Sequence, residues 1–415
     1  LVELARERRR IGRGSGLDAV GITDAATFEA ARRAILERRA DGRSAGMQFV
    51  YRNPDRSTDP AATLPGVQAI VVGAQSYLRA EPASQEAPDV DARRSRGGRA
   101  RGGVADGAGG GAAGGVGGGA GEDRPLARIA RYSWIDHYAP LRRALAPVAD
   151  RLVAAGWRAR VVADDNALVD RAAAHRAGLG WYGTNTNLLL PGAGSWFVLG
   201  SVLTDAPLTP DPGPVPDGCG PCRRCVPACP TGALSADEVT GGALDARRCL
   251  AWLLQAEGVF PAEHRVALGD RIYGCDECQA VCPVNKVSAR RRPPPVAEAT
   301  AAARADVLSI LAAGDAELLE TYGRWYIPRR QPRYLRRNAL IVLGNVGRPD
   351  DREARAALTR AVADTDPLIR AHAVWAAARL GCDDLVEGAA GDPDPMVRAE
   401  VAHRPPPRLL GSGAR

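Results

Sequence analysis

The sequence has no run of 18 consecutive apolar residues, so it predicts no transmembrane helix. It also shows no charged segment followed by an apolar stretch and a small-residue cleavage site, so we expect no secretory signal peptide. Lysine is nearly absent, since Lys286 is the single lysine among 55 Lys and Arg residues. The net charge of +7 mildly favours a polyanionic partner, but an arginine excess of this kind often reflects genome composition.

The cysteines do not form the pattern of a disulfide-rich secreted domain. There are nine, with four in CGPCRRCVPACP (219–230) and three in GCDECQAVCPVNK (274–286). Residues this close in sequence are poorly placed to bridge each other without strain. We therefore expect a reducing, cytoplasmic setting, where such clustering indicates metal binding or catalysis.

The spacing of these cysteines favours iron–sulfur clusters. C-x2-C-x2-C-x3-C-P is the bacterial ferredoxin pattern for a [4Fe–4S] cluster, in which the fourth cysteine binds the other cluster of a pair. A second, incomplete copy runs from Cys275 through Cys278 and Cys282 to Pro283, and Cys249 is the best candidate for its missing ligand. The predicted ligand sets are Cys219, Cys222, Cys225 and Cys282 for one cluster, and Cys229, Cys249, Cys275 and Cys278 for the other.

Zinc is the alternative for these eight thiols, although zinc sites usually come as separated C-x2-C pairs. The ninth cysteine, Cys382, stands alone in a helical region and is interpreted as a small buried apolar residue.

The first half of the chain predicts an α/β domain. Short buried strands are expected at DAVGIT, QAIVVGAQSYL, RARVVADDN and WFVLGSVLTD, and amphipathic helices at AATFEAARRAILERRADG, DRAAAHRAGLG and from Ile135 onward. Residues 91–124 interrupt this pattern, since 14 of the 25 residues in 97–121 are glycine. This composition predicts a disordered insert.

The C-terminal part contains a repeat. DTDPLIRAHAVWAAARLG (364–381) and GDPDPMVRAEVAHR (391–404) share the pattern D-x-D-P-apolar-apolar-R-A, and RRNALIVLGNVG (336–347) resembles the second half of the unit. An interval near 30 residues with two helices per unit predicts a short HEAT-like solenoid; a plain helical subdomain is the alternative. The predicted domains are therefore 1–214 (α/β), 215–290 (ferredoxin-type, two [4Fe–4S] clusters) and 300–410 (all-α, HEAT-like).

Several segments together resemble the epoxyqueuosine reductase family. They occur in the family's order and cover nearly the whole chain outside the glycine-rich insert: GMQFVYRNPDRSTDP (46–60), ARIARYSWIDHYAPLR (127–142), GLGWYGTNTNLLLPGAGSWFVLG (178–200), DARRCL (245–250) and GDRIYGCDECQAVCPVNK (269–286).

The resemblance implies an oxidoreductase that reduces epoxyqueuosine to queuosine at the wobble position of tRNA, the last step of queuosine biosynthesis. It implies a corrinoid (cobalamin) in the N-terminal domain, supplied with electrons by the two clusters and by an external low-potential donor. We expect a monomer that does not associate with membranes. The family's proton donor corresponds to Asp136, whose simpler interpretation is a residue favoured at a helix N-terminus.

Other candidates follow from matching the family's motifs. Corrinoid contacts are expected from Arg52, Asp136, Asp164, Asn185, Asn187, Ser195 and Gln279. An exposed arginine, a strand-end turn and an ordinary loop are the alternatives for Arg52, Asp164 and the residues of the glycine-rich loop. For tRNA, the interleaved arginine and aromatic residues of 323–338 suit phosphates and unstacked bases, with Arg329, Arg330 and Arg333 as candidates. Arg370 and Arg398 are weaker candidates, because repeat arginines often bind neighbouring helices of a solenoid.

Two other functions remain open at this point. A reductive dehalogenase-like enzyme would share the corrinoid and the paired clusters but act on small halogenated molecules. A ferredoxin-type electron carrier would bind neither corrinoid nor tRNA.

Overall fold

The computed structural model describes residues 11, 14–81, 124–236, 242–298 and 301–408. The predicted insert lies outside these residues, apart from Arg124. The chain divides into two compact units: Leu1–Pro82 with Ala130–Ala256 and Tyr273–Ala301, and Ala83–Ile129 with Glu257–Ile272 and Ala302–Arg415. The division into three domains stays a prediction.

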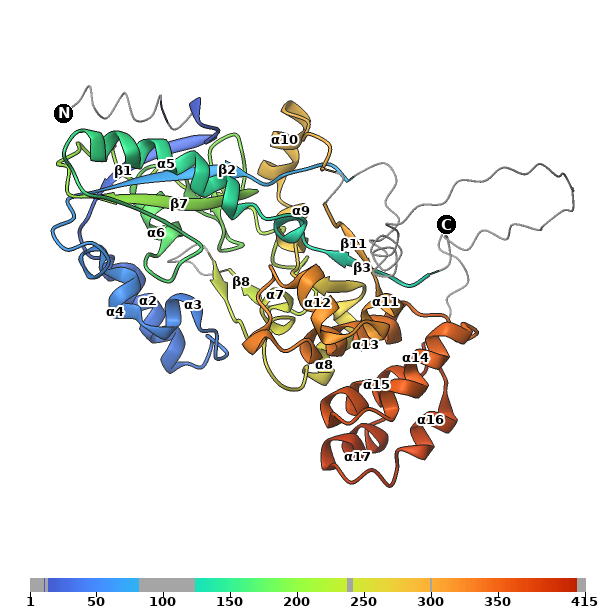
Figure 1. Cartoon of the computed structure of the whole chain (residues 1–415). Helices are drawn as coiled ribbons and strands as arrows, with labels where there is room; N and C mark the ends of the chain where they lie inside the picture. Colours follow the sequence, from blue (N-terminus) through green and yellow to red (C-terminus); the bar gives the residue numbers. More distant parts are fainter. Residues whose placement is uncertain (1–10, 12–13, 82–123, 237–241, 299–300, 409–415) are drawn as a thin grey trace, which may run out of the picture. The chain divides into compact units, whose positions relative to one another are not determined.

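The first unit is built on a four-stranded sheet of order β1-β2-β7-β4 (Figure 1). All three neighbouring pairs are antiparallel, although strands that alternate with helices are more commonly parallel. The strands are β1 (Ala19–Asp24), β2 (Ala69–Ser76), β4 (Ala159–Ala163) and β7 (Phe197–Thr204).

Helices cover both faces of this sheet. α5 (Tyr138–Ala154) packs on one face, while α2 (Glu29–Ala40) and α6 (Asp170–Arg176) contribute to the core on the other. Because side chains alternate along a strand, β2 sends Val71 to the α5 side and Ile70 and Val72 to the α6 side. The uninterrupted apolar run of β2 is thus explained by burial on both faces.

A glycine pair lets α5 approach the sheet. Gly73 of β2 is paired with Gly200 of β7. A Cβ at Gly200 would lie 2.9 Å from Leu145 of α5, and one at Gly73 would lie 3.0 Å from the same side chain. The absence of side chains at this point therefore makes room for Leu145, which is fully buried.

The cysteine region of the first unit is made of short elements and turns. It contains β8 (Leu234–Ser235) paired with β9 (Ala243–Leu244), α7 (Leu250–Leu253), α9 (Glu277–Ala280) and α10 (Pro283–Arg291). The other short elements of this unit are α3 (Phe49–Arg52), α4 (Pro54–Thr58), η1 (Pro60–Ala62), η3 (Arg131–Ser133), β5 (Trp181–Tyr182) and β6 (Leu188–Leu189).

The second unit is mostly helical. Its helices are α8 (Ala262–Leu268), α11 (Val307–Ala312), α12 (Asp315–Tyr322), η4 (Pro328–Arg330), α13 (Arg333–Val346), α14 (Arg352–Val362), α15 (Pro367–Arg379), α16 (Asp383–Gly388) and α17 (Pro395–Ala402). A small sheet of order β10-β3-β11 contains β3 (Leu126–Ile129), β10 (Arg271–Tyr273) and β11 (Arg304–Asp306).

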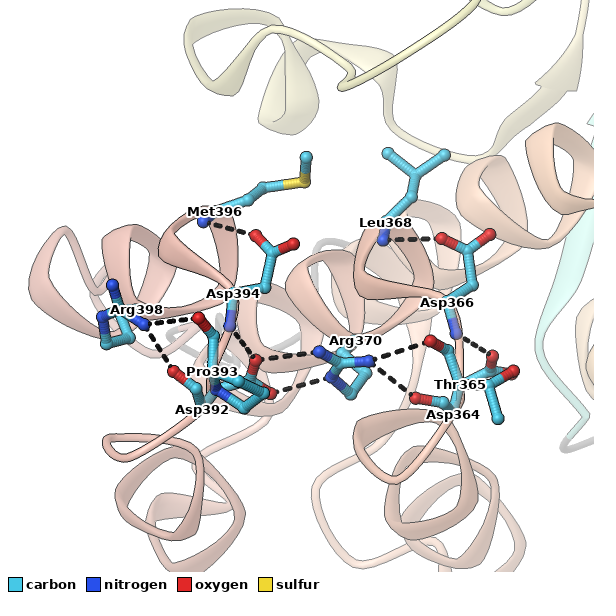
Figure 2. Close-up of polar contacts among 10 residues, drawn as sticks. All are labelled: Asp364, Thr365, Asp366, Leu368, Arg370, Asp392, Pro393, Asp394, Met396 and Arg398. Carbon is cyan, nitrogen blue, oxygen red and sulfur yellow. Dashed lines mark hydrogen bonds and ion pairs between the residues drawn. The ribbon is translucent and has the colours of Figure 1, made fainter.

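The repeated D-x-D-P sequence forms helix N-caps, one ion pair and several hydrogen bonds from arginine to backbone carbonyls (Figure 2). Asp366 and Asp394 accept hydrogen bonds from backbone amides at the starts of α15 and α17. Arg370 binds the Asp392 carboxylate of the next repeat at 2.7 and 2.8 Å, and also donates to the Asp364 carbonyl. Arg370 therefore joins two adjacent loops of the solenoid, whereas Arg398 donates only to the Asp392 and Pro393 carbonyls of its own loop.

Within the described ranges, no helix combines the length and the apolar character that crossing a membrane requires.

Candidate functional site

The structure brings four of the predicted ligands into one group. Cys219 and Cys282 belong to an apolar cluster with Trp181 and Leu189. Burial raises the pKa of the Cys225 thiol to about 11, and the neighbouring Cys219, Cys282 and Cys222 add to the rise. Cys219, Cys222, Cys225 and Cys282 are therefore electrostatic neighbours, although Cys282 lies far from the others in sequence.

The remaining four thiols form a second group. Burial raises the pKa of Cys278, with Cys275 and Cys249 as the nearest contributing thiols. Burial also raises the pKa of Cys249, and Cys229 adds to it. None of the nine cysteines, all of which lie in the described ranges, forms a disulfide. The assignment of individual cysteines to clusters stays a prediction, because Cys225 of the first set also contributes to the pKa of Cys278 in the second.

The surroundings of Cys229 suit a thiolate ligand. Burial tends to raise the pKa of its thiol, but hydrogen bonds from Thr231 and Ala233 outweigh that effect and lower it. The Ala233 amide lies 3.2 Å from the sulfur. Because metals bind the thiolate form, such donors favour the ligating state.

A buried polar network lies beside the cysteines. The Gln279 side-chain oxygen accepts hydrogen bonds from the Tyr77 hydroxyl at 3.2 Å and from the Ser195 hydroxyl at 2.9 Å. Asn285 donates to Ser195 Oγ at 3.0 Å and to the Gln279 carbonyl at 2.8 Å, and accepts from the Ser195 amide at 2.7 Å. Gly194 is required here, because its φ is +84° and a Cβ would lie 2.0 Å from the Asn285 side-chain oxygen.

Sequence reasoning named Ser195 and Gln279 as corrinoid contacts, which stays a prediction, and did not name Tyr77 or Asn285 as site residues. Both lie in segments that were singled out, at the end of the strand QAIVVGAQSYL and in VCPVNK. No local pattern indicates that these residues meet, because the contacts span 202 residues for Tyr77 with Gln279 and 90 for Ser195 with Asn285.

Asn185 and Asn187 occupy the turn between β5 and β6. Asn185 Nδ2 lies 3.4 Å from the Cys278 carbonyl, which connects this turn to the cysteine region. Thr186 between them has a positive φ of 61°. Only Asn185 of the pair is fully buried, so its amide is the better fixed of the two.

Asp136 precedes α5 and is exposed. Its Oδ1 accepts hydrogen bonds from the backbone amides of Tyr138 at 2.9 Å and Ala139 at 3.0 Å. Asp136 therefore satisfies otherwise unpaired donors of the helix N-terminus, as the simpler interpretation expects.

Asp164 interacts electrostatically with Asp136, and Asp170 interacts with Asp164. Asp164 directly follows β4 and has a strained, positive φ of 55°. Burial raises the pKa of Asp164 above its ordinary value; the Arg142 guanidinium opposes the rise and the Asp136 carboxylate adds to it. Burial, together with Asp164, also raises the pKa of Asp170 well above its ordinary value.

Arg52 is exposed at the C-terminal end of α3, and the structure does not assign it a partner among the other candidates.

The three tRNA candidates lie in the second unit, at the start of the helical repeats. Arg329 and Arg330 are consecutive residues with positive φ, of 50° and 54°. Arg329 forms an ion pair of 3.1 Å with Glu257 while 72% of its side chain stays exposed. Arg333 pairs with Asp366 at 3.0 Å and is also partly exposed. These three guanidinium groups are more accessible than that of Arg370, whose side chain is 14% exposed.

Comparison with known protein families identifies the cysteine region and the C-terminal helical repeats. Residues 218–285 match the 4Fe-4S double cluster binding domain, and residues 327–404 match HEAT repeats. The iron–sulfur and HEAT-like predictions are thus confirmed.

Two relatives that align along most of the chain are named epoxyqueuosine reductase. The epoxyqueuosine reductase of Bacillus cereus is 30% identical, over 90% of this chain and 88% of that protein. The Burkholderia pseudomallei enzyme is 33% identical, over 91% and 92%.

Solved structures of epoxyqueuosine reductases are also similar to this chain. An epoxyqueuosine reductase crystallised with an epoxyqueuosine-modified tRNA-Tyr stem loop has a TM-score of 0.77 at 27% identity, covering 96% of this chain and 97% of that one. A Bacillus subtilis structure, also with a TM-score of 0.77, 27% identity and the same coverage, has its catalytic aspartate loop swung out of the active site. Because relatives at 30% identity or more align with it along nearly their whole length, the chain belongs to the epoxyqueuosine reductase family of oxidoreductases.

Proposed function

We propose that this protein reduces epoxyqueuosine to queuosine in the anticodon of tRNA, using a corrinoid, two [4Fe–4S] clusters and Asp136 as proton donor. The observation that carries the proposal is the whole-chain similarity to an enzyme crystallised with an epoxyqueuosine-modified tRNA stem loop. A cytoplasmic setting and an external low-potential electron donor belong to the same proposal.

The residues of the first unit fit a corrinoid by their chemistry. A corrinoid carries amide side chains, which need both donors and acceptors. The carboxylates of Asp136 and Asp164 can accept, and the side-chain amides of Asn185, Asn187 and Gln279 can donate. When bound, the corrinoid would supply low-valent cobalt, which can pass electrons to the epoxide carbon.

Asp136 can cap α5 and donate a proton with different oxygens. Its Oδ1 is occupied by the two backbone amides. A protonated carboxyl still accepts at one oxygen while the hydroxyl on the other donates. Oδ2 would give its proton to the oxygen released when the epoxide opens; in total the reaction takes up two electrons and two protons and releases water.

The second unit supports the tRNA part of the proposal. Arg329 and Arg330 lie on a short segment with a sparsely populated backbone conformation, and such strain is often found at ligand-binding sites. Their side chains would contact phosphates, and Arg333 would do so at the start of α13.

The test is an anaerobic assay with the full chain. We would load both clusters and cobalamin, add epoxyqueuosine-containing tRNA and a low-potential reductant, and analyse the digested nucleosides by mass. Loss of one oxygen atom is the expected result. No mass change with a fully loaded protein would overturn the proposed function.

The role of Asp136 is tested by Asp136→Asn, because asparagine is as good a helix cap as aspartate but cannot donate an acidic proton. The expected result is a fall in kcat of about 100-fold or more, with cluster and cobalamin spectra unchanged. Asp351→Asn is the matched control, since Asp351 caps α14 through the same pair of backbone bonds. Equal activity of the two variants would contradict the assigned role.

A further inference from the structure

One buried donor beside the cysteines has no place in the proposed chemistry. Trp181 is 7% exposed and packs with Leu189 and Cys282, and Cys219 packs against the same apolar cluster. The indole Nε1 of Trp181 is shielded from solvent, and within the described part of the chain no atom accepts a hydrogen bond from it. Because an indole nitrogen is a donor only and buried donors are normally paired, this N–H calls for an acceptor that the described residues do not supply.

The position of Trp181 is fixed by its neighbours. It is paired with Leu189 between β5 and β6, and its ring lies against the segment that leads into the cysteines. A Cβ at Gly218 would lie 2.5 Å from Cζ2 and 2.9 Å from Cε2 of the ring. Cε2 is the carbon bonded to Nε1, so the edge of the indole that carries the N–H lies against the residue before Cys219.

The turn after β5 faces the same group of cysteines. A Cβ at Gly183 would lie 3.6 Å from Cys219 Sγ, and the Thr184 hydroxyl lies 3.5 Å from the Cys222 carbonyl. Residues two apart in an extended segment point to the same side, so Trp181 and Gly183 share the side that faces Cys219. The unpaired donor and the predicted ligands therefore lie together.

A buried water is a poor acceptor for this N–H. Such a water needs several polar partners of its own. The side chains packed around Trp181 are those of Leu189, Val215 and Val284 and of the two cysteines. The sulfurs of a metal cluster are thus the acceptors that these surroundings favour.

We propose that the indole N–H of Trp181 donates a hydrogen bond to a sulfur of the [4Fe–4S] cluster whose predicted ligands include Cys219 and Cys282. The inference rests on the proposed ligand set of that cluster. Hydrogen bonds to the sulfurs are among the factors that set the reduction potential of such clusters. The reduced cluster carries one more negative charge than the oxidised one, so a donor stabilises it and Trp181 raises the potential.

The experiment is a redox titration of the reconstituted full chain, followed by electron paramagnetic resonance, without corrinoid or tRNA. Trp181→Phe keeps an aromatic ring but removes the N–H. We expect the midpoint potential of one cluster to fall by a tenfold change in the reduction equilibrium, about 59 mV for one electron. The other midpoint and the iron content should stay as in the wild type.

A second readout detects the hydrogen bond itself. Pulsed electron paramagnetic resonance of the reduced protein, labelled with ¹⁵N at the indole nitrogen of its tryptophans, should show a ¹⁵N coupling at one cluster. This coupling should be lost in Trp181→Phe.

Trp252→Phe is the matched control. Trp252 is 6% exposed and lies three residues after Cys249, a predicted ligand of the other cluster. Its indole N–H already donates to the Ala45 carbonyl at 3.0 Å. This variant should therefore keep both wild-type midpoints and the ¹⁵N coupling.

Midpoints that do not change in Trp181→Phe, or an equal shift in Trp252→Phe, would overturn the inference. Absence of a ¹⁵N coupling in the wild type would do the same, and this result needs no variant, so it decides the matter even if Trp181→Phe fails to hold its iron. Both measurements are made without corrinoid and substrate, so their outcome is independent of whether the protein acts on tRNA.

Discussion

The Tyr77 hydroxyl donates to the side-chain oxygen of Gln279 across 202 residues of sequence, and both side chains are buried. This bond joins the residue that follows β2 to helix α9, which also carries Cys278. The Tyr77 ring also lies 5.6 Å from the ring of His137, the neighbour of Asp136. Tyr77 therefore contacts both helix α9 and the segment that carries the proposed proton donor.

Gln279→Leu tests how much this network contributes. Leucine has a similar volume but leaves the buried Tyr77 hydroxyl without its acceptor, at a cost of about 1–3 kcal/mol, and leaves the Ser195 hydroxyl only a longer bond of 3.4 Å to Asn285. We expect a lower free energy of unfolding by urea and weaker cobalamin binding in a spectroscopic titration. Gln48→Leu is the matched control, because Gln48 is exposed. Equal stability of the two variants would show that the network is dispensable.

A buried ion pair gives a second prediction. Arg265 is 1% exposed and binds Glu400 through two bonds, of 2.7 and 2.8 Å. Glu400→Gln leaves the buried guanidinium without a counter-charge, which typically costs about 3–5 kcal/mol. Urea unfolding should show this loss, whereas Asp384→Asn, which removes the exposed partner of Arg355, should unfold like the wild type. A similar effect of both changes would contradict the importance of burial.

Local and long-range features of the sequence differ in what they predict. DAVGIT, RARVVADDN and WFVLGSVLTD do form β1, β4 and β7, because each carries its own apolar pattern. The antiparallel direction of the strands was not predictable, since it depends on the path of the connections rather than on any strand. The double-cluster domain at residues 218–285 was predictable from cysteine spacing, which chemistry constrains tightly, whereas the ligand set of each cluster stays a prediction. The Asn285 contacts were not predictable, because only the folded chain brings helix α10 to Ser195.

We expect different effects from replacing an exposed arginine of the helical repeats and replacing the arginine that links two repeats. Arg329→Ala removes an exposed guanidinium and should weaken tRNA binding, with a lower salt dependence by about one unit of slope. Arg370→Ala removes the link between repeats and should lower the melting temperature. Fluorescence anisotropy across a salt series and thermal unfolding separate the two effects. A loss of tRNA affinity in Arg370→Ala without a change in stability would contradict the structural role of that residue.

His372 makes stability depend on pH. Burial lowers its pKa well below the ordinary 6.5, and Arg265 adds to the effect. The neutral ring donates from Nδ1 to the Leu368 carbonyl at 2.7 Å and accepts the Phe260 amide at Nε2. In the unfolded chain the ring takes up a proton below about pH 6.5, and in the folded chain it does not. The unfolded state then binds more protons, so stability is present above pH 6.5 and lost as the pH falls below it.

We expect the free energy of unfolding to decrease by up to about 1.4 kcal/mol per pH unit from this group. His372→Gln keeps hydrogen-bonding capacity without titrating, so the difference in unfolding free energy between wild type and variant should shrink or reverse between pH 6.5 and 5. A pH-independent difference would show that His372 is protonated in the folded protein.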